Sequence, residues 1–412
     1  MEEWKTYKLS EIAKLSTGFP FDGSKYSKEG IRVVRGDNVT IGALRWETDK
    51  DKRWNIPFDR ANEYSLQDGD IVVGMDGSRV GRNRAQVQQS DLPLLIAQRV
   101  ACIRNNELSH QQFLYYQIFS NRFCDYIKSV QTGTSIPHVS LKQIGDYEVV
   151  LPSLPYQIKI ANVLSALDSK IELNNRINHN LEEQAQAMYK SWFVDFEPFK
   201  DGKFIESELG MIPEGWRVLP AESICPINIG KTPPRSEHTW FSSDKQNITW
   251  VSISDMGNAG CFINSSAETL TKEAVEKFNI KVVPQGSILL SFKLTIGRVA
   301  IAGKELTSNE AIARFEASDY QRSFLFLTLK SYDYSSLGST SSIATAVNSK
   351  IIKSMPIICP TDKIMTDFHF LTNDIFTEIQ IRQEETSRLS ELRDSLLPKL
   401  MSGELKINEI DC

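Results

Sequence analysis

The sequence predicts an α+β fold with two similar domains of mixed strands and helices, each followed by a long helix. We expect the two helices to pair as an antiparallel coiled coil, which would give the chain pseudo-two-fold symmetry. Three observations predict this fold: an internal repeat, a heptad pattern after each copy of the repeat, and a polar interruption at the same place in both heptad patterns. A length of 412 residues agrees with more than one domain.

The repeat is visible as matching features that follow one another in the same order in both halves. Each half has an early tryptophan and glycine, a turn leading into a short apolar strand, and a final strand that ends in proline. The matching pairs are Trp4 with Trp216, Gly18 with Gly230, DGDIVVGMDG (Asp68 to Gly77) with PQGSILLSFK (Pro284 to Lys293), and Pro152 with Pro360. The common order of these weak matches indicates a duplicated domain.

These features divide the chain into six segments. We expect domains at 1–152 and 211–360, spacer helices at 153–199 and 361–405, a linker at 200–210 and a C-terminal tail at 406–412.

The two expected helices each carry apolar residues at alternating steps of four and three, which is the seam pattern of a coiled coil. The first seam is Ile160, Leu164, Leu167, Ile171, Asn174, Asn178, Leu181, Ala185, Met188 and Trp192. The second is Phe368, Thr372, Ile375, Ile379, Arg382, Thr386, Leu389, Arg393, Leu396 and Leu400. A seam of this length is about 50 Å long at 1.5 Å per residue.

Polar residues interrupt both seams near their centres, Asn174 and Asn178 in the first and Arg382 and Thr386 in the second. In an antiparallel pair these centres face each other, so the four residues would form one polar layer. A buried polar layer penalises slipped registers, because a slip would place amides against leucines. We therefore expect this layer to fix the register of the two helices.

Bulk composition excludes several classes of protein. The chain has 41% hydrophobic and 24% charged residues and no long apolar run, which indicates a cytoplasmic protein with no membrane partner. Six scattered cysteines and five histidines show no metal-ligand spacing, so no metal is expected. The net charge of −5 means that any nucleic-acid contact must come from local patches. Nucleotide-binding glycine motifs and the Asn/Asp-Pro-Pro-aromatic motif of adenine methyltransferases are absent from the sequence.

One long run carries a family resemblance. It is TGTSIPHVSLKQIGDYEVVLPSLPYQIKIANVLSALDSKIELNNRINHNLEEQAQAMYKSWF, from Thr132 to Phe193, together with LLPKLMSGEL, from Leu396 to Leu405. These segments and the duplicated layout resemble the specificity subunit of type I restriction-modification enzymes. The second half departs from the pattern, with SSIATAVNS (Ser341 to Ser349) in place of GTSIPHVS (Gly133 to Ser140), and Met365 in place of Gln157.

The resemblance implies a non-catalytic subunit that recognises double-stranded DNA. Each of two target-recognition domains would read one half of a split, asymmetric site, with the paired helices as the spacer between them. It further implies two methyltransferase subunits docked on the helices, and restriction subunits with translocase and nuclease activity. No cofactor is expected on this chain, while S-adenosylmethionine, ATP and Mg²⁺ are expected on the partners.

Candidate DNA contacts lie on loops that combine cations, small polar residues and glycines, because such loops can approach phosphates and base edges closely. In the first domain the candidates are Arg35, Asn38, Arg79, Arg82, Arg84, Thr134, Ser135 and His138. In the second domain they are Lys231, Arg235, Ser252, Lys293, Thr295 and Arg298. The different side chains in the two sets predict two different half-sites.

Three alternatives stay open at this level. The aromatic end of the first helix, with Trp192, Phe193 and Phe196, either contacts a methyltransferase partner or packs on its own domain. The chain as a whole could instead serve a modification-only system. It could also be a coiled-coil adaptor that binds proteins without DNA specificity.

Overall fold

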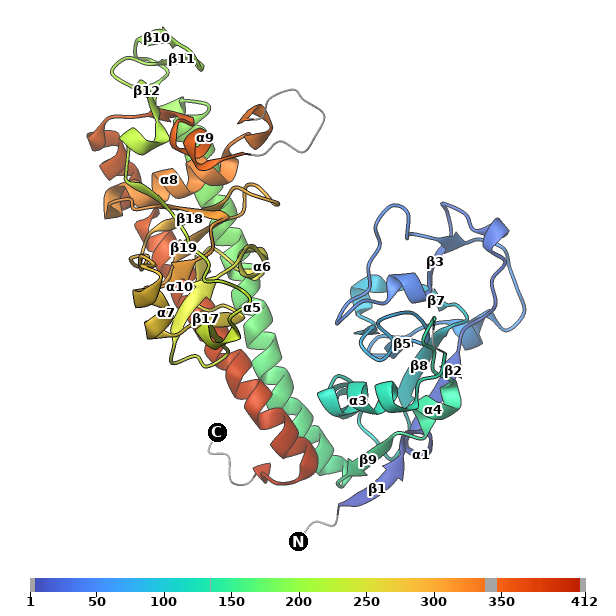
Figure 1. Cartoon of the computed structure of the whole chain (residues 1–412). Coiled ribbons are helices and arrows are strands. Elements are labelled where there is room, and N and C mark those ends of the chain that lie inside the picture. Colours follow the sequence, from blue (N-terminus) through green and yellow to red (C-terminus); the bar gives the residue numbers. More distant parts are fainter. Residues whose placement is uncertain (1–3, 134, 338–346, 408–412) are drawn as a thin grey trace. The chain divides into compact units, whose positions relative to one another are not determined.

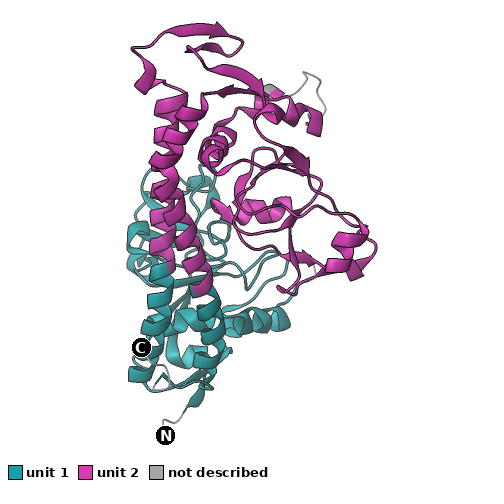
Figure 2. Ribbon diagram, turned by 90° about the vertical axis from the view of Figure 1, so that its left-hand side faces the viewer, with its two compact units in different colours: residues 1–170, 389–412 teal, residues 171–388 magenta. Residues whose placement is uncertain are grey.

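The computed structural model describes residues 4–133, 135–337 and 347–407. These residues form two compact units, 1–170 with 389–412 and 171–388 (Figure 2). Each unit contains one domain together with one end of both long helices, α5 (Leu154–Phe193) and α10 (Asp362–Ser402). The compact units therefore differ from a linear division of the chain, because the helices are shared between them.

The first domain is built on a four-stranded antiparallel sheet (Figure 1). Its order is β2 (Ala13–Thr17), β8 (Val100–Asn105), β5 (Ile71–Gly74) and β6 (Arg84–Gln86). A smaller sheet has the order β4 (Arg53–Trp54), β3 (Ile31–Val34), β7 (Leu94–Ile96), and β1 (Lys5–Lys8) pairs with β9 (Glu148–Leu151). Four helices complete the domain: α1 (Leu9–Ile12), α2 (Gln111–Ile118), α3 (Asn121–Val130) and α4 (Leu141–Gly145).

The second domain repeats this plan. Its main sheet has the order β13 (Ile227–Ile229), β21 (Ile312–Phe315), β18 (Ile288–Ser291), β19 (Val299–Ala302) and β16 (Phe262–Ile263). The smaller sheet has the order β14 (Phe241–Ser242), β17 (Glu268–Leu270), β15 (Ile248–Val251), β20 (Thr307–Ser308), and β12 (Arg217–Pro220) pairs with β22 (Pro356–Cys359). The helices are α6 (Ile253–Asn258), α7 (Lys272–Lys277), α8 (Asp319–Ser331) and α9 (Ser349–Lys353).

Corresponding strands pair in corresponding ways in the two domains. β5 lies between β6 and β8 as β18 lies between β19 and β21, and all four pairings are antiparallel. The pairs β3 with β7 and β15 with β20 are both parallel. In each domain the first strand of the repeat pairs with the strand that leads into the long helix. The predicted fold class, two similar α+β domains with a long helix after each, is confirmed.

The segment between α5 and β12 is more ordered than an extended linker. β10 (Phe204–Ser207) and β11 (Gly210–Pro213) form an antiparallel hairpin there.

The predicted seams form the contact between α5 and α10. All seam positions on both helices are buried or half-buried. In unit 1, Asp168 accepts a hydrogen bond of 2.8 Å from Arg393, and in unit 2 Phe193 lies 4.8 Å from Phe368, ring centre to ring centre. The residue number falls on α10 as it rises on α5, so the helices run antiparallel, as predicted.

Both helix ends join the core of their unit. Ile160, Leu164 and Leu400 are fully buried and pack in one cluster with the helices and strands of the first domain. Ala185, Phe193 and Phe368 do the same with the second domain. Burial of these side chains, worth about 1.5–3 kcal/mol each for the larger ones, attaches each domain to the helix pair.

Gln157 near the start of α5 and Met365 at the corresponding position of α10 are both buried, but they make different contacts. Gln157 is fully buried, donates to the carbonyl oxygens of Leu108 (3.0 Å) and Pro152 (2.9 Å), and accepts from the amide of His110 (2.9 Å). Met365 is buried in the apolar core of unit 2. The departure of the second half from the first therefore exchanges a polar clamp for apolar packing.

Candidate nucleic-acid interface

Three loops of the first domain meet around Asp76, which follows β5. The amide of Gly77 donates to the carbonyl oxygen of Pro137 at 3.0 Å, which joins this loop to the one before α4. A Cβ atom on Gly36, in the loop after β3, would lie 3.3 Å from a carboxylate oxygen of Asp76. Arg99, in the turn between β7 and β8, pairs with the same carboxylate at 3.6 Å. The fold therefore brings together loops that are distant in the sequence.

Several of the predicted contact residues are exposed on these loops. Arg79 and Arg82 are exposed, and neither guanidinium forms an ion pair with any residue that the structure describes. Ser135 is exposed, and so is His138, whose Nε2 lies 3.0 Å from the Thr132 hydroxyl. These side chains are available to phosphates or base edges.

Arg35 is only partly available. Its guanidinium lies over the ring of Tyr26 at 5.7 Å and pairs with Asp37 at 3.8 Å. The side chain keeps one quarter of its surface exposed.

Two predicted contacts in the first domain do not fit the structure. Asn38 is fully buried, and its amide nitrogen donates to the carbonyl oxygens of Arg45 and Lys50. Arg84 is buried and donates to main-chain oxygens of Gly81 and Phe119, so it supports the loop from within. Thr134 lies outside the described residues, as does most of the segment from Ser341 to Ser349.

In the second domain the loop after β18 has the same place as the loop after β5. Lys293 and Thr295 are exposed on it. Arg298 is half-buried and donates to the carbonyl oxygen of Ile253 at 2.6 Å, which ties this loop to the start of α6. Ser252 caps α6 through a reciprocal pair of hydrogen bonds with Asp255, so its predicted role as a DNA contact is replaced by a structural one.

The other two predicted cations of the second domain are engaged in the fold. Lys231 donates to the carbonyl oxygen of Phe278 at 2.6 Å. Arg235 pairs with Glu268 at 2.9 Å and stacks on the rings of Phe241 and Trp250, 4.1 Å and 4.6 Å from their centres. Both remain exposed, but a DNA contact would have to compete with these partners.

Sequence reasoning missed Arg99 and Leu294. Both are non-glycine residues in the left-handed backbone region, with φ of 74° and 62°. Neither stands in a recognisable loop motif, and backbone conformation at a single residue is set by the surrounding strands. No signal in the sequence marks either position.

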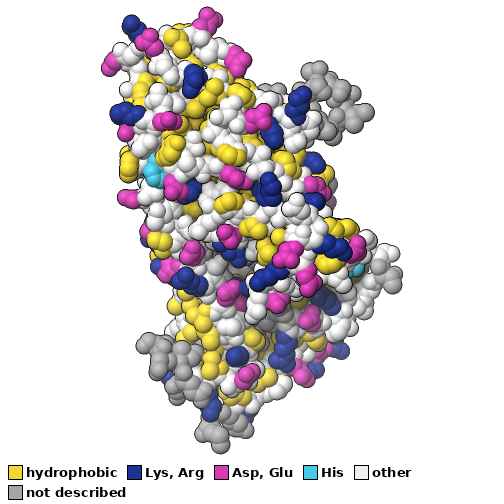
Figure 3. All heavy atoms as spheres, turned by 60° about the vertical axis from the view of Figure 1, so that its left-hand side comes forward, with side chains coloured by type: hydrophobic (Ala, Val, Ile, Leu, Met, Phe, Trp, Pro, Cys, Tyr) yellow, Lys and Arg dark blue, Asp and Glu magenta, His cyan; other side chains and the backbone are white. Residues whose placement is uncertain are grey.

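The face of the protein in Figure 3 carries Lys and Arg side chains interspersed with Asp and Glu. No continuous basic stripe is seen on this face. This agrees with the net charge of −5. Any contact with DNA would therefore depend on the individual exposed cations of the loops.

The predicted polar layer between the helices is present in part. The Asn174 amide donates to Glu385 at 2.8 Å, and Arg382 donates to the Asn174 carbonyl oxygen at 3.3 Å. Arg382 also pairs with Glu378 at 2.5 Å. Asn174 therefore belongs to a charged network. Two of its members, Glu378 and Glu385, were not predicted from the sequence.

Asn178 and Thr386 take no part in this network, so the four residues do not form the single layer that was expected. The Asn178 amide donates weakly to the carbonyl oxygen of Ile379 at 3.4 Å. Its side-chain oxygen and the Thr386 hydroxyl have no hydrogen-bond partner among the described residues. The cause is the helix register, which places Asn178 beside Ile379.

Unit 1 has a related polar contact that the heptad analysis did not single out as a layer. Asp168 accepts from Arg393 at 2.8 Å and from the Tyr116 hydroxyl of α2 at 2.6 Å. Burial and the hydrogen bond to Asp168 raise the pKa of Tyr116, so this hydroxyl stays protonated and donating. The contact links both helices to the first domain.

The predicted partner contact at the end of α5 is wrong for Phe193, and the aromatic group packs on its own unit. Phe193 is buried, with its ring 4.9 Å from Phe324. Trp192 and Phe196 are half-buried against the same core, and Phe196 lies 5.6 Å from Trp216. The aromatic group therefore packs within the chain, on the core of the second domain and not on the first domain that precedes α5.

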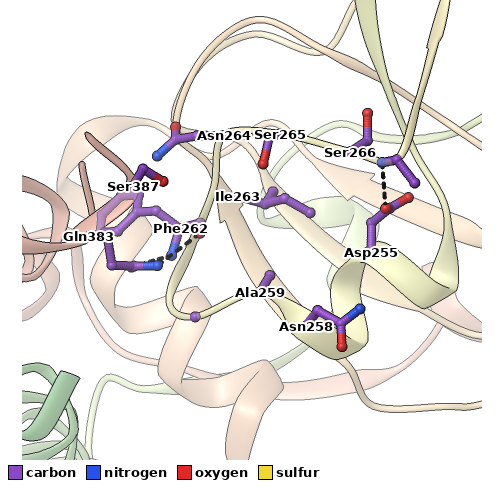
Figure 4. A pocket seen from close by; sticks show the side chains of 12 residues that line it. Asp255, Asn258, Ala259, Phe262, Ile263, Asn264, Ser265, Ser266, Gln383 and Ser387 are labelled. Atoms are coloured by element: carbon purple, nitrogen blue, oxygen red, sulfur yellow. Dashed lines mark hydrogen bonds between the residues drawn. The ribbon is translucent and has the colours of Figure 1, made fainter. Parts of the chain in front are cut away.

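Gln383 of α10 clamps the second domain to the helix. Its side-chain oxygen accepts from the amide of Phe262 at 2.9 Å, and its nitrogen donates to the carbonyl oxygen of the same residue at 3.1 Å (Figure 4). Gly260 allows this close approach, because a Cβ atom there would collide with the Gln383 amide. On the other side of the same pocket, Asp255 accepts from the amide of Ala267 at 2.9 Å.

Replacing Gln383 by Leu is expected to lower the free energy of unfolding by about 1–2 kcal/mol, because two main-chain groups of Phe262 lose their partner. Ser387→Ala, on the same helix and in the same pocket, is the matched control and should change it by less than about 0.5 kcal/mol. Urea unfolding of both variants measures the difference. Equal losses would mean that the clamp contributes nothing specific.

The described residues contain no group of His, Cys, Asp and Glu side chains that could hold a metal ion. Burial raises the pKa of the Cys102 and Cys225 thiols to about 12, so neither is a ready nucleophile. No helix in the described part of the chain is long and apolar enough to cross a membrane.

Known proteins with similar sequences and structures share this duplicated architecture. A family model described as the type I restriction modification DNA specificity domain matches residues 1–183 and 213–387. The type I restriction enzyme MjaIX specificity subunit of Methanocaldococcus jannaschii is 30% identical, over 99% of this chain and 98% of its own length. The HindI specificity subunit of Haemophilus influenzae is 26% identical, over 98% of this chain and its full length.

One solved structure agrees in fold. The S subunit of a type I restriction-modification system from M. genitalium superposes with a TM-score of 0.59 at 14% identity, over 97% of this chain and 96% of its own. The family match covers most of the chain and falls on both repeats. The chain therefore belongs to the family of type I restriction-modification specificity subunits, which are non-catalytic.

Proposed function

We propose that this chain reads a bipartite, asymmetric DNA site, with one half-site for each domain. We further propose that α5 and α10 set the spacing between the half-sites and carry two methyltransferase subunits. In this proposal the protein acts in the cytoplasm, where the DNA and its partner subunits are found.

The observation that carries the proposal is the difference between equivalent loops. The loop after β5 presents Arg79 and Arg82, while the loop after β18 presents Lys293 and Thr295. Arginine donates through two nitrogens to the two acceptors of guanine, lysine reaches guanine or a phosphate as a single ammonium group, and a threonine hydroxyl can donate to or accept from several base edges. Two equivalent loops with different exposed side chains are what recognition of two different half-sites requires.

The antiparallel helix pair supports the spacing role. An α-helix of 40 residues is about 60 Å long, and one turn of DNA is about 34 Å. Two readers on the same face of the duplex must keep a constant separation and orientation. Charged contacts at Asn174 and at Asp168 hold the register of the two helices within each unit.

Catalysis is assigned to partners. We expect S-adenosylmethionine on the methyltransferase subunits, and ATP and Mg²⁺ on restriction subunits with translocase and nuclease activity. A modification-only system would lack these restriction subunits.

Mapping of adenine methylation across a genome, with and without this chain beside its methyltransferase partner, tests the proposal. We expect a bipartite motif that disappears when the chain is removed. Methylation that does not depend on the chain, or failure of the complex to retain any DNA sequence-specifically, would instead favour an adaptor without DNA specificity.

A further inference from the structure

Leu294 is an unusual residue in the loop between β18 and β19. The residue is 98% exposed, the largest exposure among the large hydrophobic residues that the structure describes. Its φ of 62° lies in the left-handed region that residues with a side chain rarely adopt. The leucine therefore combines two unfavourable features, exposed apolar surface and a strained backbone.

The fold does not require a leucine here. In the first domain the third residue after β5 is Gly77, with φ of 97°, and Leu294 is the third residue after β18. Glycine adopts this conformation without strain. A side chain that touches almost nothing in its own domain, at a position where glycine serves in the other repeat, points to a role outside the fold.

The loop holds Leu294 firmly in this position. The buried Ser291 hydroxyl donates to the carbonyl oxygen of Thr295 at 2.6 Å and accepts from the amide of Arg298 at 3.1 Å. The amide of Gly297 donates to the carbonyl oxygen of Ser291 at 3.0 Å. The Arg298 guanidinium anchors the loop to the carbonyl oxygen of Ile253. Because these hydrogen bonds already fix the backbone of the loop, binding through the Leu294 side chain would cost little conformational entropy.

The neighbours of Leu294 favour nucleic acid over protein as the ligand. Lys293 and Thr295 on either side are exposed, and they are suited to phosphate and base-edge contacts. A protein-docking site would instead be expected to surround the leucine with further exposed apolar residues. A single apolar side chain between polar contacts matches how proteins approach the apolar parts of bases.

We propose that Leu294 makes an apolar contact with a base in the half-site read by the second domain, and so determines specificity there. The contact is with a thymine methyl group in the major groove or with the face of a base in an opened step. This inference rests on the proposed function, since it assigns one contact within that DNA site.

The experiment uses the full chain in complex with its methyltransferase partner, and duplexes selected by the wild-type complex from a random library. Leu294→Ala and Leu294→Gly remove the side chain, and the glycine variant also removes the backbone strain. We expect both to fold, and to bind the selected duplex about tenfold more weakly with unchanged affinity for unrelated DNA. Leu108→Ala, at a half-exposed leucine of the first domain, is the control and should bind as wild type.

Two DNA probes distinguish the two kinds of apolar contact. Replacing thymine by uracil at single positions of the half-site should weaken wild-type binding at one position, but not binding by Leu294→Gly, if the methyl group is the target. If a step is opened, 2-aminopurine at that step should brighten with the wild type only.

The failures are distinguishable. If the wild-type complex selects no sequence, the proposed function itself fails. If it selects a bipartite site that the Leu294 variants bind with equal affinity and specificity, only this inference is overturned. Loss of the methyltransferase partner from the variants would also overturn it, since Leu294 would then be a protein contact.

Discussion

Replacing Arg79, Arg82 and Arg99 together by alanine is expected to weaken binding of the selected DNA at least about a hundredfold, if each contact is worth about 1 kcal/mol or more. All three residues are exposed and lie on the loops that meet around Asp76, and only Arg99 has an ion-pair partner among the described residues. Their removal leaves no buried group unpaired. Binding of the methyltransferase complex to labelled duplex, measured by fluorescence anisotropy, gives the effect.

Salt dependence separates phosphate contacts from base contacts in this variant. Each lost phosphate contact should reduce the slope of log affinity against log salt by about 0.9, whereas a lost base contact should leave the slope nearly unchanged. Lys128→Ala is the control, because it removes an exposed cation that pairs with Asp125 at 3.1 Å on the surface of α3. Equal affinity of the triple variant and the control would exclude this loop junction as the DNA interface of the first domain.

Replacing Asn174 by Leu is expected to lower the free energy of unfolding by about 2 kcal/mol. Asn174 is fully buried, and its amide contacts both Arg382 and Glu385 on the facing helix. A leucine would remove one hydrogen-bond acceptor of the partly buried Arg382, whose guanidinium also pairs with Glu378. Urea unfolding of the isolated chain measures the loss.

Asn178→Leu is the matched variant, one helical turn further along α5. Its amide makes a single weak hydrogen bond, and its carbonyl oxygen has no partner among the described residues. Leucine should therefore be neutral or stabilising at this position, since it replaces an incompletely bonded polar group. If the two variants lost equal stability, the charged network at Asn174 would not be what holds the register.

Much of the architecture was predictable because it depends on the spacing and order of residues along the chain. The heptad seams follow from the spacing of apolar residues, and every predicted seam position on α5 and α10 is buried or half-buried. The repeat follows from the common order of strand, turn and proline. The antiparallel pairing followed from the matching polar interruptions, although only Asn174 and Arg382 of the four residues meet as expected.

The candidate site was predictable only as a set of loops. Asn38, Arg84 and Ser252 looked like DNA contacts because of their residue types, but in the fold each satisfies nearby main-chain groups. Arg235 looked free and is paired with Glu268, 33 residues away. A polar side chain on a loop can use the same atoms to hydrogen-bond to the main chain of the loop or to a ligand. Residue type alone therefore does not distinguish a structural residue from a DNA contact.

Periodicity and the order of features along the chain are enough to establish the duplicated α+β plan, the two long helices and the polar interruption in each of them. Folding is needed to establish which loops meet at Asp76, which cations lack an ion-pair partner among the described residues, and that Arg99 and Leu294 adopt the left-handed conformation. These features depend on hydrogen-bond partners and backbone geometry that segments far away in the sequence supply.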